Sequence, residues 1–153
     1  MYKYSTHNEN NDISLHDCRA TKILFTDNIL SFLFKDGFYV CVHNKDNDKR
    51  KLSYTDMSEA KFKILYNDII IYIFTETDDK DKAIRETISL DTLMEKINGG
   101  MELEFISVFK GYQSYIFVCW LWFDFEPYHK ECEIILSADK ETYYWNTIFT
   151  DDE

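Results

Sequence analysis

The sequence predicts a mainly β protein, an antiparallel meander forming a β-sandwich or a barrel of about ten strands with one short helix. Aromatic residues make up 17% of the 153 residues, and they favour the pleated, half-buried surface of a strand. Short apolar segments follow one another along the chain, separated by turn-forming residues. Strands joined by short turns pair with their sequence neighbours, which makes the predicted sheet antiparallel.

Three strands are predicted near the start of the chain, at residues 20–25, 29–34 and 38–43. Asp36-Gly37 indicates a hairpin between the second and third of these. A two-residue type I′ turn needs positive φ at both central residues, and an Asp-Gly pair accepts this conformation. The first and second strands are joined by a turn at residues 26–28.

A further hairpin is predicted about Asn67-Asp68, with strands at residues 60–66 and 69–75. Residues 83–88 form another short strand. The one predicted helix follows, with Ser89 as its N-cap and glycines at its end. Its apolar residues recur at helical spacing: Leu90, Leu93, Met94 and Ile97.

The second half of the chain is predicted to form strands at residues 101–109, 112–125, 131–137 and 142–149. The strand at 112–125 is apolar on both faces. One face would carry Ile116, Val118, Trp120 and Trp122, and the other Tyr115, Phe117, Cys119, Leu121 and Phe123. One sandwich layer uses less apolar surface than this, so we expect the surplus to meet the helix, another subunit or a ligand.

We expect a single domain over residues 1–153. Residues 1–14 are polar and predict a loosely ordered start, or a short edge strand at Tyr2–Ser5, and residues 150–153 form an acidic end. The start shows no signal-peptide pattern, and the apolar run at 115–123 is too short to span a bilayer as a helix. These observations predict a cytoplasmic protein with four reduced cysteines.

The charge balance indicates which partners fit the surface. Seventeen basic and 28 acidic residues give a net charge of −11. Such a surface repels nucleic-acid phosphates and anionic membranes, so we expect neither as a partner. A basic protein partner fits this charge, although solubility alone would also account for it.

Two groups of acidic residues are candidates for binding a basic partner. The first lies in a predicted loop and contains Glu76, Asp78, Asp79 and Asp81. The second lies on the polar sides of two alternating strands and contains Glu102, Glu104, Glu131 and Glu133. If those two strands are neighbours, the second group forms a patch of four carboxylates on the sheet.

Motifs for chemistry are weak in this sequence. His16-Asp17-Cys18 brings together a base, an acid and a thiol, but a capped turn beside a packed Cys18 explains it better. His129-x-x-Cys132 is half of a zinc site without a second half, and the acidic loop at residues 76–82 lacks the glycine and glutamate of a calcium loop. We therefore predict a protein that is not an enzyme and has no cofactor or metal.

An alternative function places Trp120 and Trp122 in the wall of a cavity. The protein would then be a β-barrel that binds a small ligand against aromatic rings. A closed barrel with an apolar cavity would favour this function, and a packed core with an exposed acidic or aromatic patch would favour protein interaction.

The start of the chain resembles a known group of proteins. Leu15-His16-Asp17-Cys18-Arg19-Ala20, followed by two strands and Asp36-Gly37-Phe38, is similar to the start of small bacterial proteins. Some of these are immunity proteins of polymorphic toxin systems, and others have no assigned function. The resemblance covers about a quarter of the chain and implies a β-rich protein that binds and blocks a cognate toxin.

Overall fold

The computed structural model describes residues 1–153 as thirteen strands and one helix. In chain order these are β1 (Tyr4–Thr6), β2 (Ile13–Ser14), β3 (Cys18–Ala20), β4 (Lys22–Thr26), β5 (Ile29–Phe34), β6 (Tyr39–Val40), β7 (Ser53–Thr55), β8 (Ser58–Glu76), β9 (Ala83–Ile88), α1 (Leu90–Asn98), β10 (Glu102–Gly111), β11 (Ser114–Trp122), β12 (His129–Trp145) and β13 (Ile148–Phe149). The predicted fold class, mainly β and antiparallel with one short helix, is confirmed.

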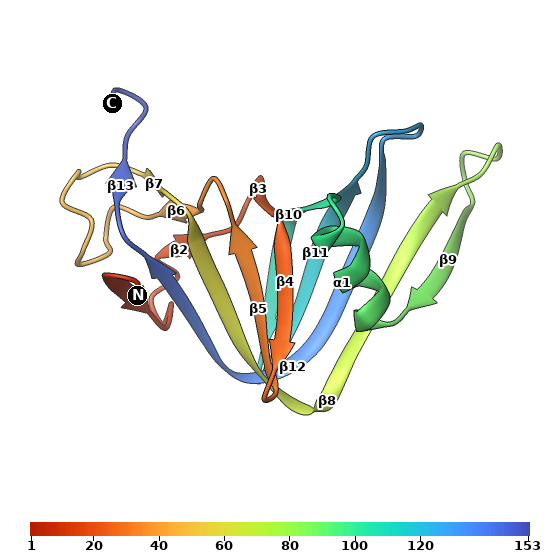
Figure 1. Ribbon diagram of the computed structural model, residues 1–153, viewed down its shortest axis with the longest axis horizontal. Coiled ribbons are helices and arrows are strands. Elements are labelled where there is room, and N and C mark those ends of the chain that lie inside the picture. The colour runs from red at the N-terminus through yellow and green to blue at the C-terminus, as the bar shows by residue number, and fades with distance from the viewer.

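The main sheet curls into a half-barrel (Figure 1). Its strands follow the order β3-β10-β11-β12-β8-β5-β4, with β1 added to β12 and β9 added to β8. Because only Thr21 separates β3 from β4, the chain itself links the two ends of this order, and the Thr21 amide donates to Leu33 O at 2.8 Å. A second, smaller sheet has the order β13-β7-β6-β2.

Phenylalanine rings fill the concave side of the curled sheet. Phe32 of β5 meets Phe62 of β8, Phe105 of β10 and Phe117 of β11, with ring centroids 6.0, 5.2 and 6.1 Å apart. All four side chains are fully buried, and their rings meet edge to face, which is a favoured aromatic geometry. These contacts join strands that are distant in sequence and hold the curl of the sheet.

The hairpin predicted about Asn67-Asp68 is wrong, because β8 runs unbroken from Ser58 to Glu76. Tyr66 and Asn67 do have positive φ, but they form a large bulge. On β12, Leu136 pairs with Ile69 and Ala138 pairs with Ile64, so residues 65–68 of β8 lie opposite a single residue. The two predicted strands at 131–137 and 142–149 likewise merge largely into β12, which therefore supports both halves of β8.

The hairpin predicted about Asp36-Gly37 is also wrong. Both edges of β5 are already paired, with β4 on one side and β8 on the other, so no edge is free for a return strand. The Gly37 amide instead donates to Phe34 O at 3.1 Å, and the chain leaves for the smaller sheet. The turn with two positive φ angles lies at Asp27 (54°) and Asn28 (62°), between β4 and β5.

The helix forms as predicted. Ser89 Oγ accepts a hydrogen bond from the Thr92 amide at 3.1 Å, and Leu93 and Ile97 are buried in the core. At the end of the helix, the Asn98 side chain accepts from Ile23 N and donates to Ile23 O, both at 2.9 Å. Asn98 thus satisfies backbone groups on the outer edge of β4, which would otherwise be open to pairing.

The two ends of the chain are more ordered than the sequence indicates. Residues 1–14 include β1, which pairs with β12 near the alternative edge strand at Tyr2–Ser5, and β2 of the smaller sheet. Residues 150–153 form a turn in which Glu153 and Asp152 make ion pairs with Lys49 and Lys51. All four cysteines are free thiols. The nine-residue helix is too short to cross a membrane.

Replacement of Phe32 by Ala is expected to lower the free energy of unfolding by about 3–5 kcal/mol, because it leaves a cavity among the rings of Phe62, Phe105 and Phe117. Phe109→Ala is the matched control, because that ring is exposed on the other face and its loss should change stability by about 0.5 kcal/mol or less. Urea denaturation followed by circular dichroism measures both. Equal losses would show that the phenylalanine cluster does not hold the sheet together.

Candidate functional site

Strand β11 carries large side chains on both of its faces, as predicted. Phe117, Cys119 and Leu121 point into the core and are buried. Ile116 and Trp120 point the other way, with exposed fractions of 39% and 37%. The helix α1 packs against β4 and β8, and both of its buried residues belong to the core, so it does not cover the outer face of β11.

Cross-strand pairing organises this outer face into rows. One row crosses six strands in the order Arg19, Glu104, Trp120, Glu131, Phe74 and Arg85. The row on one side contains Glu102, Trp122 and His129. The two rows on the other side contain Ser107, Val118, Glu133 and Tyr72, and Phe109, Ile116, Ile135 and Ile70. We call these four rows the tryptophan face.

Trp122 is held by two charged neighbours. Its indole Nε1 donates to Glu104 Oε1 at 2.8 Å, and the Arg19 guanidinium lies 4.5 Å from its ring centroid. Arg19 also pairs with Glu104 at 3.6 Å and with Glu102 at 3.9 Å. Glu104 is a buried acceptor, so the two β10 carboxylates mainly fix Arg19 and the indole in place.

Other cations and rings also stack on this face. His129 lies parallel to Trp120, with ring centroids 4.7 Å apart, and lies equally close to Trp122. On the far side of the face, the Arg85 guanidinium lies 4.5 Å from the Tyr72 centroid. Guanidinium–ring contacts therefore already occur at both ends of the tryptophan face.

Glu131 and Glu133 differ from the β10 carboxylates because the eight ion pairs of the structure include neither of them. Glu131 is exposed and has Trp120 opposite it on one neighbouring strand and Phe74 on the other. A patch of four adjacent carboxylates required the two strands to be neighbours, and this condition is not met, because β11 separates β10 from β12. Aromatic rings thus lie between the two pairs of acids.

The predicted loop acids form a separate group at the tip of the β8–β9 hairpin. Asp79 pairs with Lys82 at 3.7 Å, and the Thr77 hydroxyl donates to Asp79 O and Lys82 O. Asp78 and Asp81 are exposed beside them, and Glu76 ends β8 on the same side as Phe74. None of these four acids belongs to the four rows of the tryptophan face.

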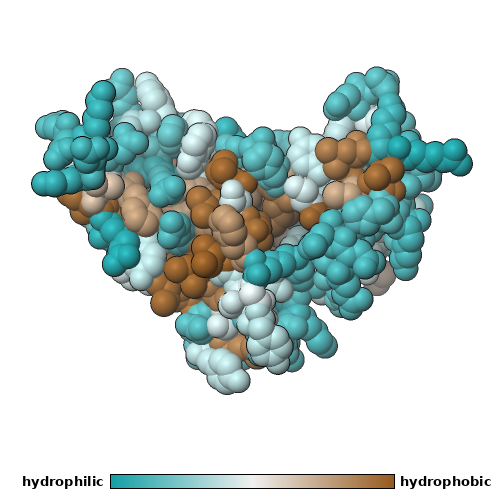
Figure 2. Space-filling view, turned by 180° about the vertical axis from the view of Figure 1, so that it is seen from behind, coloured by the Kyte–Doolittle hydropathy of each residue, from teal (hydrophilic) through white to brown (hydrophobic).

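Trp120 and Trp122 do not line an internal cavity, which corrects the ligand-barrel alternative for these two residues. The inside of the half-barrel is filled by phenylalanine rings, and both indoles lie on the outer side of β11. Figure 2, seen from behind, shows apolar residues gathered in the middle of this view. The surplus of apolar surface predicted for this strand is therefore an exposed face.

In each of the two chemical motifs, the fold places the histidine and the cysteine in different surroundings. Cys18 is buried, and burial raises its pKa to about 12, so it is a protonated packing residue. His16 is exposed, and its Nδ1 lies 2.7 Å from Ile106 O. His129 lies on the outer face while Cys132 is buried on the inner face, because three residues along a strand reverse the side. These two residues cannot bind one metal ion together.

Sequence reasoning missed Arg19, Tyr72, Phe74 and Arg85 as parts of this face. Tyr72 and Phe74 share a side with Ile70, and this alternation was visible in the sequence. Their position beside β12 was not visible, because the predicted hairpin placed them opposite the wrong strand. The chain matches no protein-family model, no curated protein and no solved structure.

The acids of the tryptophan face are expected to differ in their effect on stability. Glu104→Ala leaves the Trp122 indole N–H without its acceptor and removes the nearer of the two carboxylate partners of Arg19. It should lower the free energy of unfolding by about 1–3 kcal/mol. Glu131→Ala removes an exposed carboxylate without an ion pair and should change it by about 0.5 kcal/mol or less. Chemical denaturation followed by tryptophan fluorescence measures both variants. A larger loss for Glu131→Ala would contradict the roles given to the two carboxylates.

Proposed function

We propose that this chain is a protein-interaction domain that binds a basic protein partner through the tryptophan face. One observation carries the proposal. Glu131 is an exposed carboxylate without an ion pair, placed between Trp120 and Phe74 on neighbouring strands of an uncovered sheet face. A carboxylate between aromatic rings suits an arginine or lysine side chain of a partner.

The apolar content of the face supports binding of a protein surface. Ile70, Ile116, Trp120 and Phe109 are each more than a third exposed. Ile70, Ile116 and Phe109 share one row of the tryptophan face, and the row of Val118 separates them from the row of Trp120. Large exposed apolar patches with polar rims are typical of interaction sites. Tryptophan, tyrosine and arginine contribute most often to the binding energy of protein interfaces, and all three occur here.

The charges of the face favour a cationic partner. Arg19 over Trp122 and Arg85 over Tyr72 are internal examples of the contact that a partner's arginine would make. Glu131 and Glu133 take part in none of the eight ion pairs, and the chain has a net charge of −11. Complementary charge of this kind raises the association rate and disfavours acidic partners.

The similarity of the chain's start to immunity proteins suggests one class of partner, a toxin with a basic surface. An inhibitor of this kind needs an exposed and rigid surface, not catalytic groups. The tryptophan face is built on strands and is braced by the Glu104–Trp122 hydrogen bond and the Arg19 contacts. A braced surface loses little conformational freedom on binding, which favours affinity.

Binding of a hexa-arginine peptide, followed by tryptophan fluorescence at low salt, tests the proposal. The double variant Glu131→Gln, Glu133→Gln should weaken binding about tenfold or more, because two charge-assisted contacts are lost. Trp120→Ala should weaken it as well. Hexa-glutamate should not bind.

The matched control is the double variant Asp78→Asn, Asp79→Asn, which removes the same two charges from the hairpin loop. It should change the affinity about twofold or less. If both double variants weaken binding equally, the peptide responds to net charge alone and the tryptophan face is not the binding site.

A further inference from the structure

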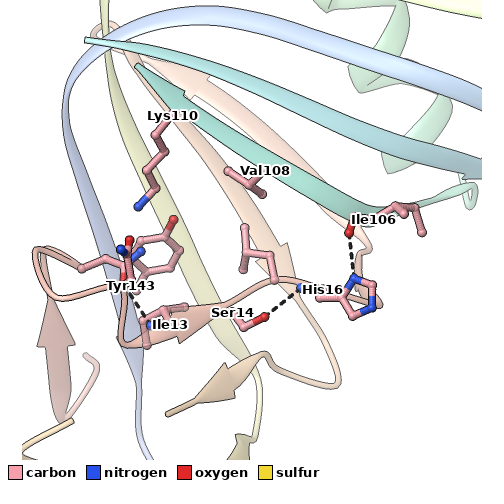
Figure 3. A pocket seen from close by; sticks show the side chains of 10 residues that line it. Ile13, Ser14, His16, Ile106, Val108, Lys110 and Tyr143 are labelled. Carbon is pink, nitrogen blue, oxygen red and sulfur yellow. Dashed lines mark hydrogen bonds between the residues drawn. The ribbon is translucent and has the colours of Figure 1, made fainter. Parts of the chain in front are cut away.

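A gap in the main sheet lies beside the second half of β10, after Phe105. Strand β3 pairs only with residues Leu103 to Phe105, so the edge of β10 beyond Phe105 has no strand partner. The segment at residues 8–16 passes along this edge and leaves a cavity of about 360 Å³ (Figure 3). A cavity of about 480 Å³ adjoins it and shares Asn8, Asn11 and Lys110.

The segment that closes the cavity is anchored at both ends. At one end, His16 Nδ1 lies 2.7 Å from Ile106 O, and the Asp17 amide donates to Phe105 O at 2.8 Å. At the other end, His7 Nδ1 lies 3.3 Å from Glu141 O. Asn8 is buried and its Oδ1 accepts from the Ile13 amide at 2.9 Å. The cavity is therefore part of the ordered fold.

Five of the ten residues that line the cavity are apolar and five are polar. The aliphatic side chains are Ile13, Leu15, Ile106 and Val108. Lys110 lies at one end and His16 at the other, and no acidic side chain lines this cavity. Figure 3 shows the Lys110 ammonium directed toward Tyr143 and the closing segment, with Val108 between Lys110 and Ile106.

The carboxylate of Glu141 is already bound by Lys110 and Tyr143. Glu141 is buried, its Oε1 lies 2.6 Å from Lys110 Nζ, and its Oε2 accepts from the Tyr143 hydroxyl at 3.2 Å. Burial and the nearby Glu141 carboxylate raise the pKa of Tyr115 to about 12, so that this phenol also stays protonated and can donate. Lys110 has three N–H donors and a side chain that is 30% exposed, which leaves donors for a ligand.

We propose that this cavity binds a small monocarboxylic acid with an aliphatic body. The carboxylate would accept hydrogen bonds from Lys110, and the body would lie along Val108, Ile106, Ile13 and Leu15 toward His16. The volume falls within the range of about 300–1,000 Å³ typical of small-molecule sites. The net charge of −11 opposes anions in general, so binding depends on the local ammonium and the apolar lining.

Octanoate titrated into protein with ¹³C-labelled methyl groups tests this site. Saturable shifts are expected at the methyl groups of Ile13, Leu15, Ile106 and Val108. Octylammonium has the same chain and the opposite charge, and it should bind at least tenfold more weakly. The proposal is overturned if octanoate gives no saturable shift, if octylammonium binds equally well, or if the shifts fall on Ile70 and Ile116 of the tryptophan face.

Two variants locate the ligand within the cavity. Val108→Phe fills the space and should weaken octanoate binding tenfold or more, while Ile116→Phe on the outer face is the matched control and should leave it unchanged. The double variant Lys110→Met, Glu141→Gln avoids an unpaired buried carboxylate and should abolish the preference for octanoate over octylammonium. If this variant does not fold, the comparison of octanoate with octylammonium and the effect of Val108→Phe still test the proposal. Unchanged binding in Val108→Phe overturns the proposal.

Discussion

Edge-to-face packing of phenylalanine rings on the concave side of the sheet is the interaction on which the other features rest. Phe32, Phe62, Phe105 and Phe117 come from four strands and meet at centroid distances of 5.2–6.1 Å. Rings of this size bring the strands around a common centre and leave no room for a ligand there. The curl of the sheet, the filled interior and the outward position of the tryptophans follow from this one cluster.

A curled sheet that is not fully hydrogen-bonded around its circumference leaves edges to be satisfied. The edge of β4 is satisfied by the Asn98 side chain at the end of α1. The edge of β10 is only partly paired, because β3 covers three of its residues. Beside the remaining residues of β10, the segment at 8–16 leaves a cavity. The same requirement thus gives a closed edge in one place and a cavity with a lysine in the other.

The two proposed sites lie on opposite sides of the same strands. Along β10, Glu104 belongs to the tryptophan face, while Val108 and Lys110 line the cavity beyond the bulge between Phe105 and Ser107. The bulge shifts the alternation of the strand by one residue, which turns Val108 inward. One irregularity therefore separates an outer surface suited to a protein from an inner space suited to a small acid.

The sequence was sufficient to predict the type of the elements, the helix with its Ser89 cap, and the apolar residues on both faces of β11. Alternation and capping are local properties of the chain. The sequence was not sufficient to predict which strands are neighbours. Asp36-Gly37 and Asn67-Asp68 are both typical turn sequences, but neither forms the predicted hairpin. After Asp36-Gly37 no return strand can pair with β5, because β4 and β8 already occupy both of its edges. Asn67-Asp68 lies in a bulge of β8, which pairs with β12 on both sides of the bulge. The placement of Trp120 between Glu104 and Glu131, and of Lys110 beside Glu141, depends on pairing between distant segments, which the burial of the whole core decides and no local pattern encodes.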